Sequence, residues 1–191
     1  MDNWLNNYMD GYKKSLESIP YNIINSIIEK FAKANNQGKQ IFVFGNGGSA
    51  SNASHFVTDM AKGASDKTEN RFKCYSLNEH IGLITAISND YSYKDIYKRQ
   101  MENFASEGDL LFTMSVSGNS PNLVEAVKWA NDNGLHTIAM VGGAKGQLAE
   151  IAKEVIVIDS THYGHVEDIH MLICHMIAYA FMENPEIADS L

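Results

Sequence analysis

Hydrophobic residues along this chain switch several times between helical and strand-like spacing. Over the first forty residues they recur at steps of three and four, which predicts two helices, divided at Pro20 and ended at Gly38. Five short apolar runs rich in β-branched and aromatic residues predict strands at 40–44, 72–77, 109–115, 137–141 and 154–158. The intervening spacing predicts helices at 49–62, 81–88, 92–105, 121–133 and 147–151, and a long apolar helix at 166–182.

The alternation of predicted buried strands with helices is typical of βαβ units, whose parallel sheet is buried on both faces. We therefore predict an α/β fold, a three-layer sandwich with a five-stranded parallel sheet, plus N-terminal helices and a long C-terminal helix. Because no repeat or Pro-rich linker interrupts the chain, residues 1–191 are predicted to form a single domain. One sheet cannot cover every apolar helix face, so we expect the helical extension at 1–38 to make oligomer contacts.

Charge and composition exclude several classes of partner. Fifteen Lys and Arg against 23 Asp and Glu give a net charge of −8, which disfavours binding to nucleic acid or to an anionic membrane surface. The apolar runs fall short of the roughly 20 residues that a transmembrane helix needs, and the N-terminus does not resemble a signal peptide. The two cysteines, Cys74 and Cys174, form no CxxC pattern, which favours a reducing compartment. We expect a cytoplasmic protein.

Two polar loops follow predicted strands at their carboxyl ends, where parallel sheets bind ligands. The first, Gly45–Ala50, formally matches the dinucleotide pattern G-x-G-x-x-A. That interpretation is weak, because the acidic residue expected after the second strand is absent at 76–78. A Walker loop is excluded, because no Gly-Lys-Ser/Thr follows. A tight turn that needs positive φ would explain one glycine, but not the polar neighbours as well.

The second loop, Ser115–Ser120, offers three hydroxyl groups at the N-terminus of a predicted helix. Backbone N–H groups and the helix dipole there can bind an anion without any Lys or Arg. Helix capping by Ser120 or Asn119 would explain one of these side chains but not all three serines. We therefore expect this loop to hold a small phosphate ester.

Histidines and carboxylates recur at helical spacing in two further segments. His55 and Asp59 are four residues apart and share a helix face, while Glu167 and His175 lie about two turns apart on the last helix. Two imidazoles and two carboxylates suit Zn²⁺ or another divalent ion. A surface ion pair is an alternative for His55 and Asp59. His170 with Cys174, and His162 with His165, are competing sets that spacing alone does not exclude.

With these pieces in place, the sequence resembles the sugar isomerase (SIS) domain and, within it, the phosphoheptose isomerases. The resemblance covers nearly the whole chain and implies a flavodoxin-like sheet. It is carried by Gly45-Asn46-Gly47-Gly48-Ser49-Ala50, His55, Ser88-Asn89-Asp90, Arg99-Gln100, Glu107-Gly108-Asp109, Ser115-Val116-Ser117-Gly118-Asn119-Ser120 and the segment from Glu167 to His175.

The resemblance implies an aldose–ketose isomerase that converts D-sedoheptulose 7-phosphate to D-glycero-D-manno-heptose 7-phosphate, the first step of bacterial heptose nucleotide biosynthesis. It also implies a homotetramer with one Zn²⁺ per subunit. The implied substrate-binding residues are Asn46, Gly47, Gly48, Ser49, Asn89, Asp90, Ser115, Val116, Ser117, Ser120 and Glu167. The implied metal ligands are His55, Asp59, Glu167 and His175, with Asp59 as the catalytic base and His175 as its acid partner.

The chain departs from the family pattern at three of these positions. Asp59 stands where Glu is usual, Glu167 where Gln is usual, and Val116 where Thr is frequent. We interpret the exchanged carboxylates as the mark of a variant subgroup whose metal site has more negative ligands. Two alternatives stay open: an isomerase of another phosphosugar, and a non-catalytic SIS module that senses a sugar phosphate or binds a protein partner.

Overall fold

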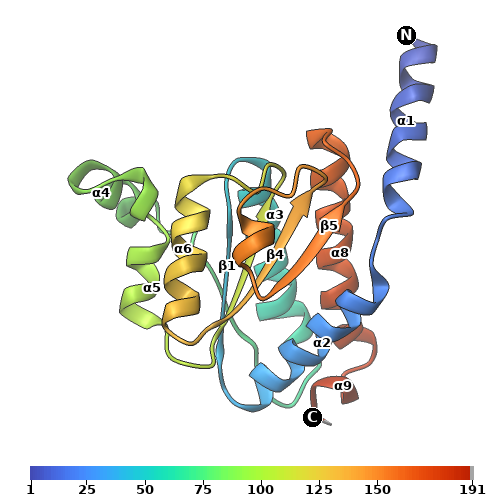
Figure 1. Ribbon diagram of the computed structural model, residues 1–191. Coiled ribbons are helices and arrows are strands. Elements are labelled where there is room, and N and C mark those ends of the chain that lie inside the picture. Colours follow the sequence, from blue (N-terminus) through green and yellow to red (C-terminus); the bar gives the residue numbers. More distant parts are fainter. Residues whose placement is uncertain (190–191) are drawn as a thin grey trace.

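The protein is described by a computed structural model over residues 1–189 (Figure 1). Its sheet contains β1 (Gln40–Gly45), β2 (Lys73–Ser76), β3 (Leu110–Ser115), β4 (His136–Gly142) and β5 (Glu154–Ile158). The strand order is β2-β1-β3-β4-β5, and every neighbouring pair is parallel. The predicted five-stranded parallel sheet is confirmed. From β1 the chain passes to β2 on one side, and from β3 to β4 on the other, so the sheet has its topological switch point between β1 and β3.

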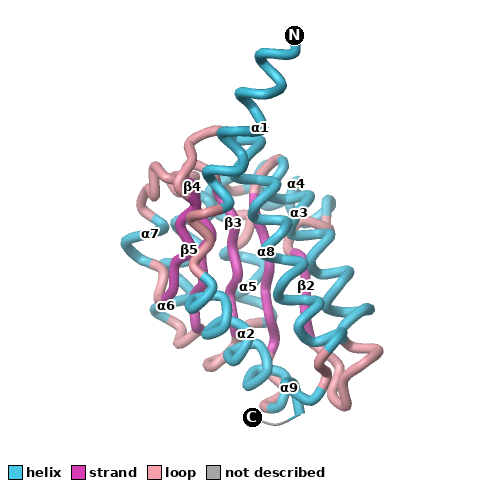
Figure 2. Tube along the Cα trace, turned by 90° about the vertical axis from the view of Figure 1, so that its right-hand side faces the viewer, coloured by secondary structure: helices cyan, strands magenta, loops and turns pink. Residues whose placement is uncertain are grey.

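Helices cover both faces of the sheet, as predicted. One layer contains α2 (Tyr21–Asn36), α3 (Gly48–Thr58) and α8 (Tyr163–Glu183), which Figure 2 shows in front of the strands. The other contains α4 (Ile81–Asp90), α5 (Lys98–Phe104), α6 (Pro121–Asp132) and α7 (Leu148–Ile151). Side chains alternate between the layers: Ile41 and Val43 pack into the α2, α3 and α8 core, and Phe42 and Phe44 into the other.

Two helix ends follow local chemistry that the sequence contains. Gly38, at φ +64°, ends α2, and the next N–H, from Lys39, bonds back to the carbonyl of Ala34 at 2.8 Å. The last long helix begins at Tyr163, three residues before the predicted start, because the ring of His162 accepts the N–H of His165 and caps it. A short α9 (Glu186–Asp189) follows α8.

Two predicted helices differ from the structure. The helix predicted at 49–62 is α3 only as far as Thr58 and continues as a wider π-helical turn at Asp59–Ala64. The helix predicted at 92–105 is a short 3₁₀ turn, Tyr93–Asp95, followed by α5. In both places the apolar spacing persists while the hydrogen-bond pattern changes, and hydrophobic periodicity does not report that pattern.

The first helix, α1 (Asp2–Leu16), extends away from the body of the molecule (Figures 1 and 2). It touches α8 through Tyr8, whose ring meets that of His165 with centroids 4.4 Å apart. Trp4 and Leu5 on α1 are 58% and 50% exposed. An apolar stripe therefore lies open on this helix. Within the described residues, no helix has the length and apolarity needed to cross a membrane.

Candidate active site

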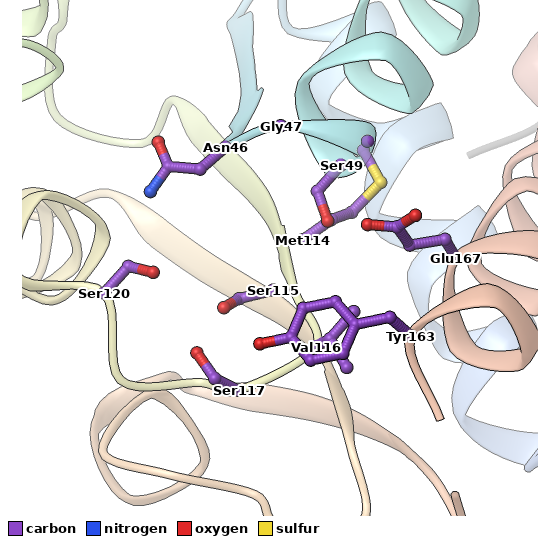
Figure 3. A pocket seen from close by; sticks show the side chains of 11 residues that line it. Asn46, Gly47, Ser49, Met114, Ser115, Val116, Ser117, Ser120, Tyr163 and Glu167 are labelled. Atoms are coloured by element: carbon purple, nitrogen blue, oxygen red, sulfur yellow. The ribbon is translucent and has the colours of Figure 1, made fainter. Parts of the chain in front are cut away.

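A pocket of about 370 Å³ opens at the switch point of the sheet (Figure 3). The loops after β1 and β3 form two of its walls, and the start of α8 forms a third. Its lining residues are Asn46, Gly47, Gly48, Ser49, Met114, Ser115, Val116, Ser117, Ser120, Tyr163 and Glu167. Open α/β sheets bind their ligands at this place, beyond the carboxyl ends of the strands.

The glycines of the first loop serve two different purposes. Gly47 has φ +56° and ψ −125°, a backbone conformation that side chains with a Cβ rarely adopt. Gly48 begins α3 directly beside Glu167, and a Cβ added there would collide with the Glu167 carboxylate. The loop therefore needs one glycine for its turn and another for the close approach of α8.

Asn46 is held in the pocket wall by a network of hydrogen bonds. Its Oδ1 accepts from the Tyr97 hydroxyl at 3.0 Å and from Asn122 Nδ2 at 2.9 Å, while its own Nδ2 donates to Asn122 Oδ1 at 2.9 Å. The single hydroxyl hydrogen of Tyr97 is shared between Asn46 Oδ1 and the carbonyl of Gly45, which lies 2.5 Å from the hydroxyl oxygen. Burial raises the pKa of Tyr97, so this hydroxyl keeps its proton. One N–H of the Asn46 amide remains for a ligand.

The serine loop presents neutral donors to the pocket. The hydroxyl of Ser115 accepts the N–H of Gly118 at 3.0 Å, and that of Ser117 accepts the N–H of Asn119 at 3.3 Å. Ser120 precedes α6, yet within the described residues its side chain accepts no helix N–H. All three hydroxyl hydrogens can therefore point at a ligand. Since no Lys or Arg is among the described lining residues, an anion here would be bound by hydroxyls, amides and the α6 dipole.

The third wall contains two side chains from α8. Glu167 is half-buried, and burial, followed by the charge of Asp168, raises the pKa of its carboxyl group. Tyr163 is exposed, and its ring lies beside the serine loop with the hydroxyl toward Ser115 and Ser117 (Figure 3). Sequence reasoning missed Tyr163 and Met114. The available signals were that Met114 directly precedes the serine loop and that Tyr163 follows the fifth predicted strand.

A second group of polar side chains lies farther along α3 and α8. Nε2 of His55 is 3.5 Å from Oδ2 of Asp59, Nε2 of His175 is 3.6 Å from the same oxygen, and the two nitrogens are 3.4 Å apart. These three residues form the group that could hold a metal ion within the described part of the chain. Oδ2 of Asp59 is buried and has no hydrogen-bond partner among the residues that the structure describes.

The dimensions of this triangle fit a metal ion. Two ligands of a tetrahedral Zn²⁺, each about 2.0–2.1 Å from the ion, are about 3.4 Å apart. The triangle edges of 3.4–3.6 Å match that separation and leave the fourth position to a further ligand. A buried carboxylate oxygen without a hydrogen bond is costly unless a cation or a proton satisfies it. The residues present therefore fit a divalent ion with an open coordination position.

Comparison with known proteins identifies the family to which this chain belongs. Residues 7–142 match the SIS domain family. A Thermoplasma volcanium protein named probable phosphoheptose isomerase is 38% identical over 173 residues, which cover 91% of this chain and 88% of the relative. The phosphoheptose isomerase of Helicobacter pylori strain HPAG1 is 32% identical over 170 residues, covering 89% and 88%. The chain belongs to the phosphoheptose isomerase family of SIS domain proteins.

Solved structures agree with this assignment. The phosphoheptose isomerase of Neisseria gonorrhoeae superposes with a TM-score of 0.85 at 25% identity, over 100% of this chain and 98% of the other. That of Francisella tularensis superposes with a TM-score of 0.87 at 22% identity over 96% of both chains, and it supports the fold. Family membership over most of the chain indicates an aldose–ketose isomerase.

The structure brings together most of the residues that the phosphoheptose isomerase resemblance implied. Nine of the implied substrate residues line the pocket: Asn46, Gly47, Gly48, Ser49, Ser115, Val116, Ser117, Ser120 and Glu167. Asn89 and Asp90 do not. They lie exposed at the end of α4, where the Asn89 amide donates to Asp90 at 2.9 Å. Of the four implied metal ligands, Glu167 stands apart from the triangle, about 12 Å from His175 along the helix axis.

The residues of the two competing histidine sets make other contacts. His170 and Cys174 are fully buried in the core, and the sulfur of Cys174 lies 3.9 Å from that of Met114. His162 stacks on His165 with ring centroids 4.2 Å apart. Neither set belongs to the candidate metal group found among the described residues.

Proposed function

We propose that this chain converts D-sedoheptulose 7-phosphate to D-glycero-D-manno-heptose 7-phosphate. The observation that supports it best is that one pair of helices, α3 and α8, contributes both to the anion pocket and to the His55, Asp59 and His175 triangle. The separation of the two features along α8 suits an extended sugar phosphate, with the phosphate at one end and the reacting carbons at the other.

The serine loop holds the phosphate in this proposal. Hydroxyl groups of Ser115, Ser117 and Ser120 donate to phosphate oxygens, and the N-terminus of α6 adds its positive dipole end. The free N–H of Asn46 and the carboxylate of Glu167 form hydrogen bonds with the sugar hydroxyls that lie between the phosphate and the triangle. Fixing the far end of the substrate in this way orients C1 and C2 for proton transfer.

Asp59 and His175 carry out the proton transfers. Asp59 removes a proton from C1 of the open-chain ketose, the C–H electron pair becomes the C1–C2 double bond, and the oxygen on C2 takes a proton from His175. To complete the reaction, Asp59 returns its proton to C2 and His175 takes the proton of the C1 hydroxyl, whose oxygen becomes the aldehyde oxygen. The nitrogen of His175 and the oxygen of Asp59 lie 3.6 Å apart, so both groups can reach adjacent carbons. An atom bound to a metal ion cannot transfer a proton at the same time, so the ligand and proton-transfer roles of these two residues alternate.

His55, Asp59 and His175 would hold one divalent ion per subunit, with zinc as the first choice. When bound, such an ion polarises the carbonyl and hydroxyl oxygens of the substrate. Side-chain exposures of 54% for His55 and 40% for His175 leave the open coordination position accessible from one side. Glu167 becomes a fourth ligand in this proposal only if its side chain reorients toward the triangle.

The proposed assembly is a cytoplasmic homotetramer. The apolar stripe on α1 and the exposed ends of α4, with Ile81 71% and Tyr91 61% exposed, provide surfaces for subunit contacts. Because Asn89 and Asp90 also lie on α4, outside the pocket of their own chain, assembly could bring them to the pocket of a neighbouring subunit.

A panel of ketose phosphates tests the function. Purified protein, with and without added Zn²⁺, is incubated with five-, six- and seven-carbon ketose phosphates, and aldose phosphate formation is measured. We expect turnover of the seven-carbon substrate and loss of that turnover in His175→Ala. Turnover of a shorter sugar alone would redirect the proposal to another phosphosugar, and no turnover of any would favour a non-catalytic sensor.

A further inference from the structure

The π-helical turn Asp59–Ala64 contains a gap in its own hydrogen bonding. Beyond it, the N–H of Ser65 donates to the carbonyls of Met60 and Lys62, and the N–H of Asp66 donates to Lys62 at 3.0 Å. Neither of these two amides donates to the carbonyl of Ala61. At the point where the i+5 hydrogen bonds of the π-helical turn give way to i+4 bonds, one carbonyl receives no backbone N–H. That carbonyl needs another donor.

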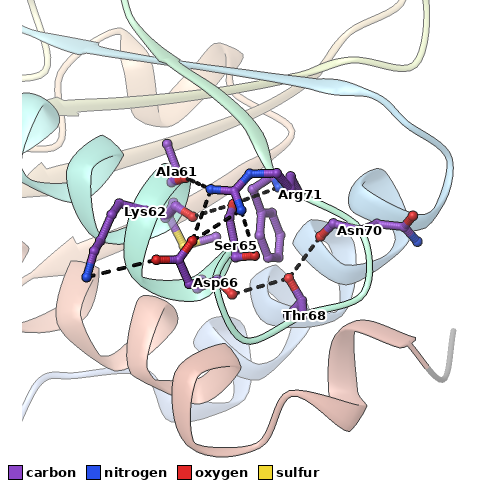
Figure 4. A network of polar contacts seen from close by, with 10 residues as sticks. Ala61, Lys62, Ser65, Asp66, Thr68, Asn70 and Arg71 are labelled. Carbon is purple, nitrogen blue, oxygen red and sulfur yellow. Dashed lines mark hydrogen bonds and ion pairs between the residues drawn. The ribbon is translucent and has the colours of Figure 1, made fainter.

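Arg71 supplies that donor (Figure 4). Its Nη2 donates to the carbonyl of Ala61 at 3.3 Å, and its Nη1 donates to the carbonyl of Ser65 at 3.4 Å. Both nitrogens also donate to Oδ1 of Asp66 at 3.1 Å, which fixes the plane of the guanidinium. The side chain thus reaches back from the segment before β2 and closes the end of the π-helical turn.

Asp59 depends on this turn for its position. It is the first residue of the π-helical turn, and within residues 1–189 its buried Oδ2 forms no hydrogen bond. The backbone must therefore aim the carboxylate at His55 and His175. Without a donor for the Ala61 carbonyl, a regular α-helix becomes the better-satisfied arrangement, and the change removes one residue from the turn. Such a shift moves the residues after the turn by about 100° of rotation and 1.5 Å of rise relative to α3, and Asp59 lies at the junction where that change begins.

We propose that Arg71 is a positioning residue for Asp59, acting through the π-helical turn to hold the triangle of His55, Asp59 and His175 in metal-binding geometry. The inference rests on the proposed function for its catalytic meaning, but its test does not need turnover. Arg71 is 64% exposed, so replacing it removes the contact with the turn without opening the core. A purely structural role would lower stability and leave metal affinity unchanged.

The test compares Zn²⁺ affinity between folded variants by competition with a chromophoric chelator. We expect Arg71→Ala to bind Zn²⁺ about tenfold to a hundredfold more weakly, the range seen for residues that orient metal ligands. Arg71→Lys should recover part of this loss, because a single ammonium cannot bridge Ala61 and Asp66 as the planar guanidinium does. Lys62→Gln is the matched control: Lys62 meets Asp66 at 4.0 Å, belongs to the same network, and leaves the Ala61 carbonyl untouched.

Thermal unfolding without metal shows whether each variant is folded. A folded Arg71→Ala protein with the Zn²⁺ affinity of the wild type would overturn the proposal, as would an equal loss in Lys62→Gln. If Arg71→Ala does not fold, Asp66→Ala decides, because it frees the guanidinium from its second anchor: weaker Zn²⁺ binding supports the proposal and unchanged binding overturns it. Wild-type protein that binds Zn²⁺ but isomerises no sugar phosphate would contradict the proposed function and leave this inference standing.

Discussion

His170 makes the stability of the fold depend on pH. Its ring is fully buried on α8, and within the described residues neither ring nitrogen makes a well-formed hydrogen bond, although the backbone of Val141 partly offsets the effect of burial. Burial lowers the pKa of His170 from 6.5 to about 4. Below pH 6.5 this histidine is protonated in the unfolded chain but stays neutral in the folded chain. Its contribution to the free energy of unfolding is therefore fully present above pH 6.5 and is lost as the pH falls toward 4. A difference of this size corresponds to about 3 kcal/mol lost by pH 4.

The variant His170→Leu removes the titrating ring and keeps an apolar side chain in the core. We expect its free energy of unfolding to fall less between pH 7 and pH 4 than that of the wild type, by about 3 kcal/mol. Urea unfolding at one fixed protein concentration measures this difference. His80→Asn is the control, because His80 is exposed and Asn can still accept the N–H of Leu83 that His80 accepts.

Equal pH dependence in the wild type and His170→Leu would refute the reasoning, whatever the absolute stabilities are. Such a result would mean that the ring finds a partner in the folded state or that the core admits the charged form. The outcome matters for the site, because His170 lies on α8 between Glu167 and His175. Destabilisation of α8 at low pH should therefore reduce activity together with stability.

The other expectations concern the pocket, the triangle and the assembly. Ser117→Ala and Ser120→Ala should each weaken phosphosugar binding by about 0.5–3 kcal/mol; unchanged affinity of both in calorimetry would contradict the phosphate assignment. Purified protein should contain about one divalent ion per chain, and EDTA should abolish turnover; a metal-free protein with full activity in EDTA would leave Asp59 and His175 as a bare acid–base pair. His175→Ala should lose activity outright, whereas Asp59→Glu should keep part of it, as measured by initial rates with a seven-carbon ketose phosphate. Light scattering at micromolar concentration should show a tetramer, and a monomer would refute the interface role of α1.

The fold was predictable because its signals are local or periodic. The runs that became β1 and β3 are predominantly apolar, and Gly38 and Pro121 mark helix ends by their own backbone preferences. The π-helical turn after Thr58 was not predictable, because Met60 and Ala64 keep helical apolar spacing through it. The carbonyl of Ala61 in this turn accepts from Arg71, which comes from a later segment, and no local pattern in the sequence indicates that contact.

The site was predictable where adjacent residues share one loop, and less so where contacts come from distant segments. The serines of 115–120 and the glycines of 45–48 lie in two continuous motifs, and both motifs line the pocket. The hydrogen bonds from Tyr97 and Asn122 to Asn46 connect three separate segments, and no pattern in the sequence links these segments. The placement of Glu167 beside Gly48 likewise depends on how closely α8 packs against α3.

The shorter side chain of Asp59 does not prevent it from reaching the histidines. Its Oδ2 lies 3.5 Å from His55 Nε2 and 3.6 Å from His175 Nε2, so the triangle closes without the additional methylene of Glu. A longer side chain at this position would have to bend to keep these spacings, because Oδ2 already lies within 3.6 Å of both ring nitrogens. The π-helical turn that begins at Asp59 is the backbone that holds this shorter carboxylate at those distances. Glu167 then supplies its carboxylate to the pocket, where the carboxylate can accept hydrogen bonds from sugar hydroxyls.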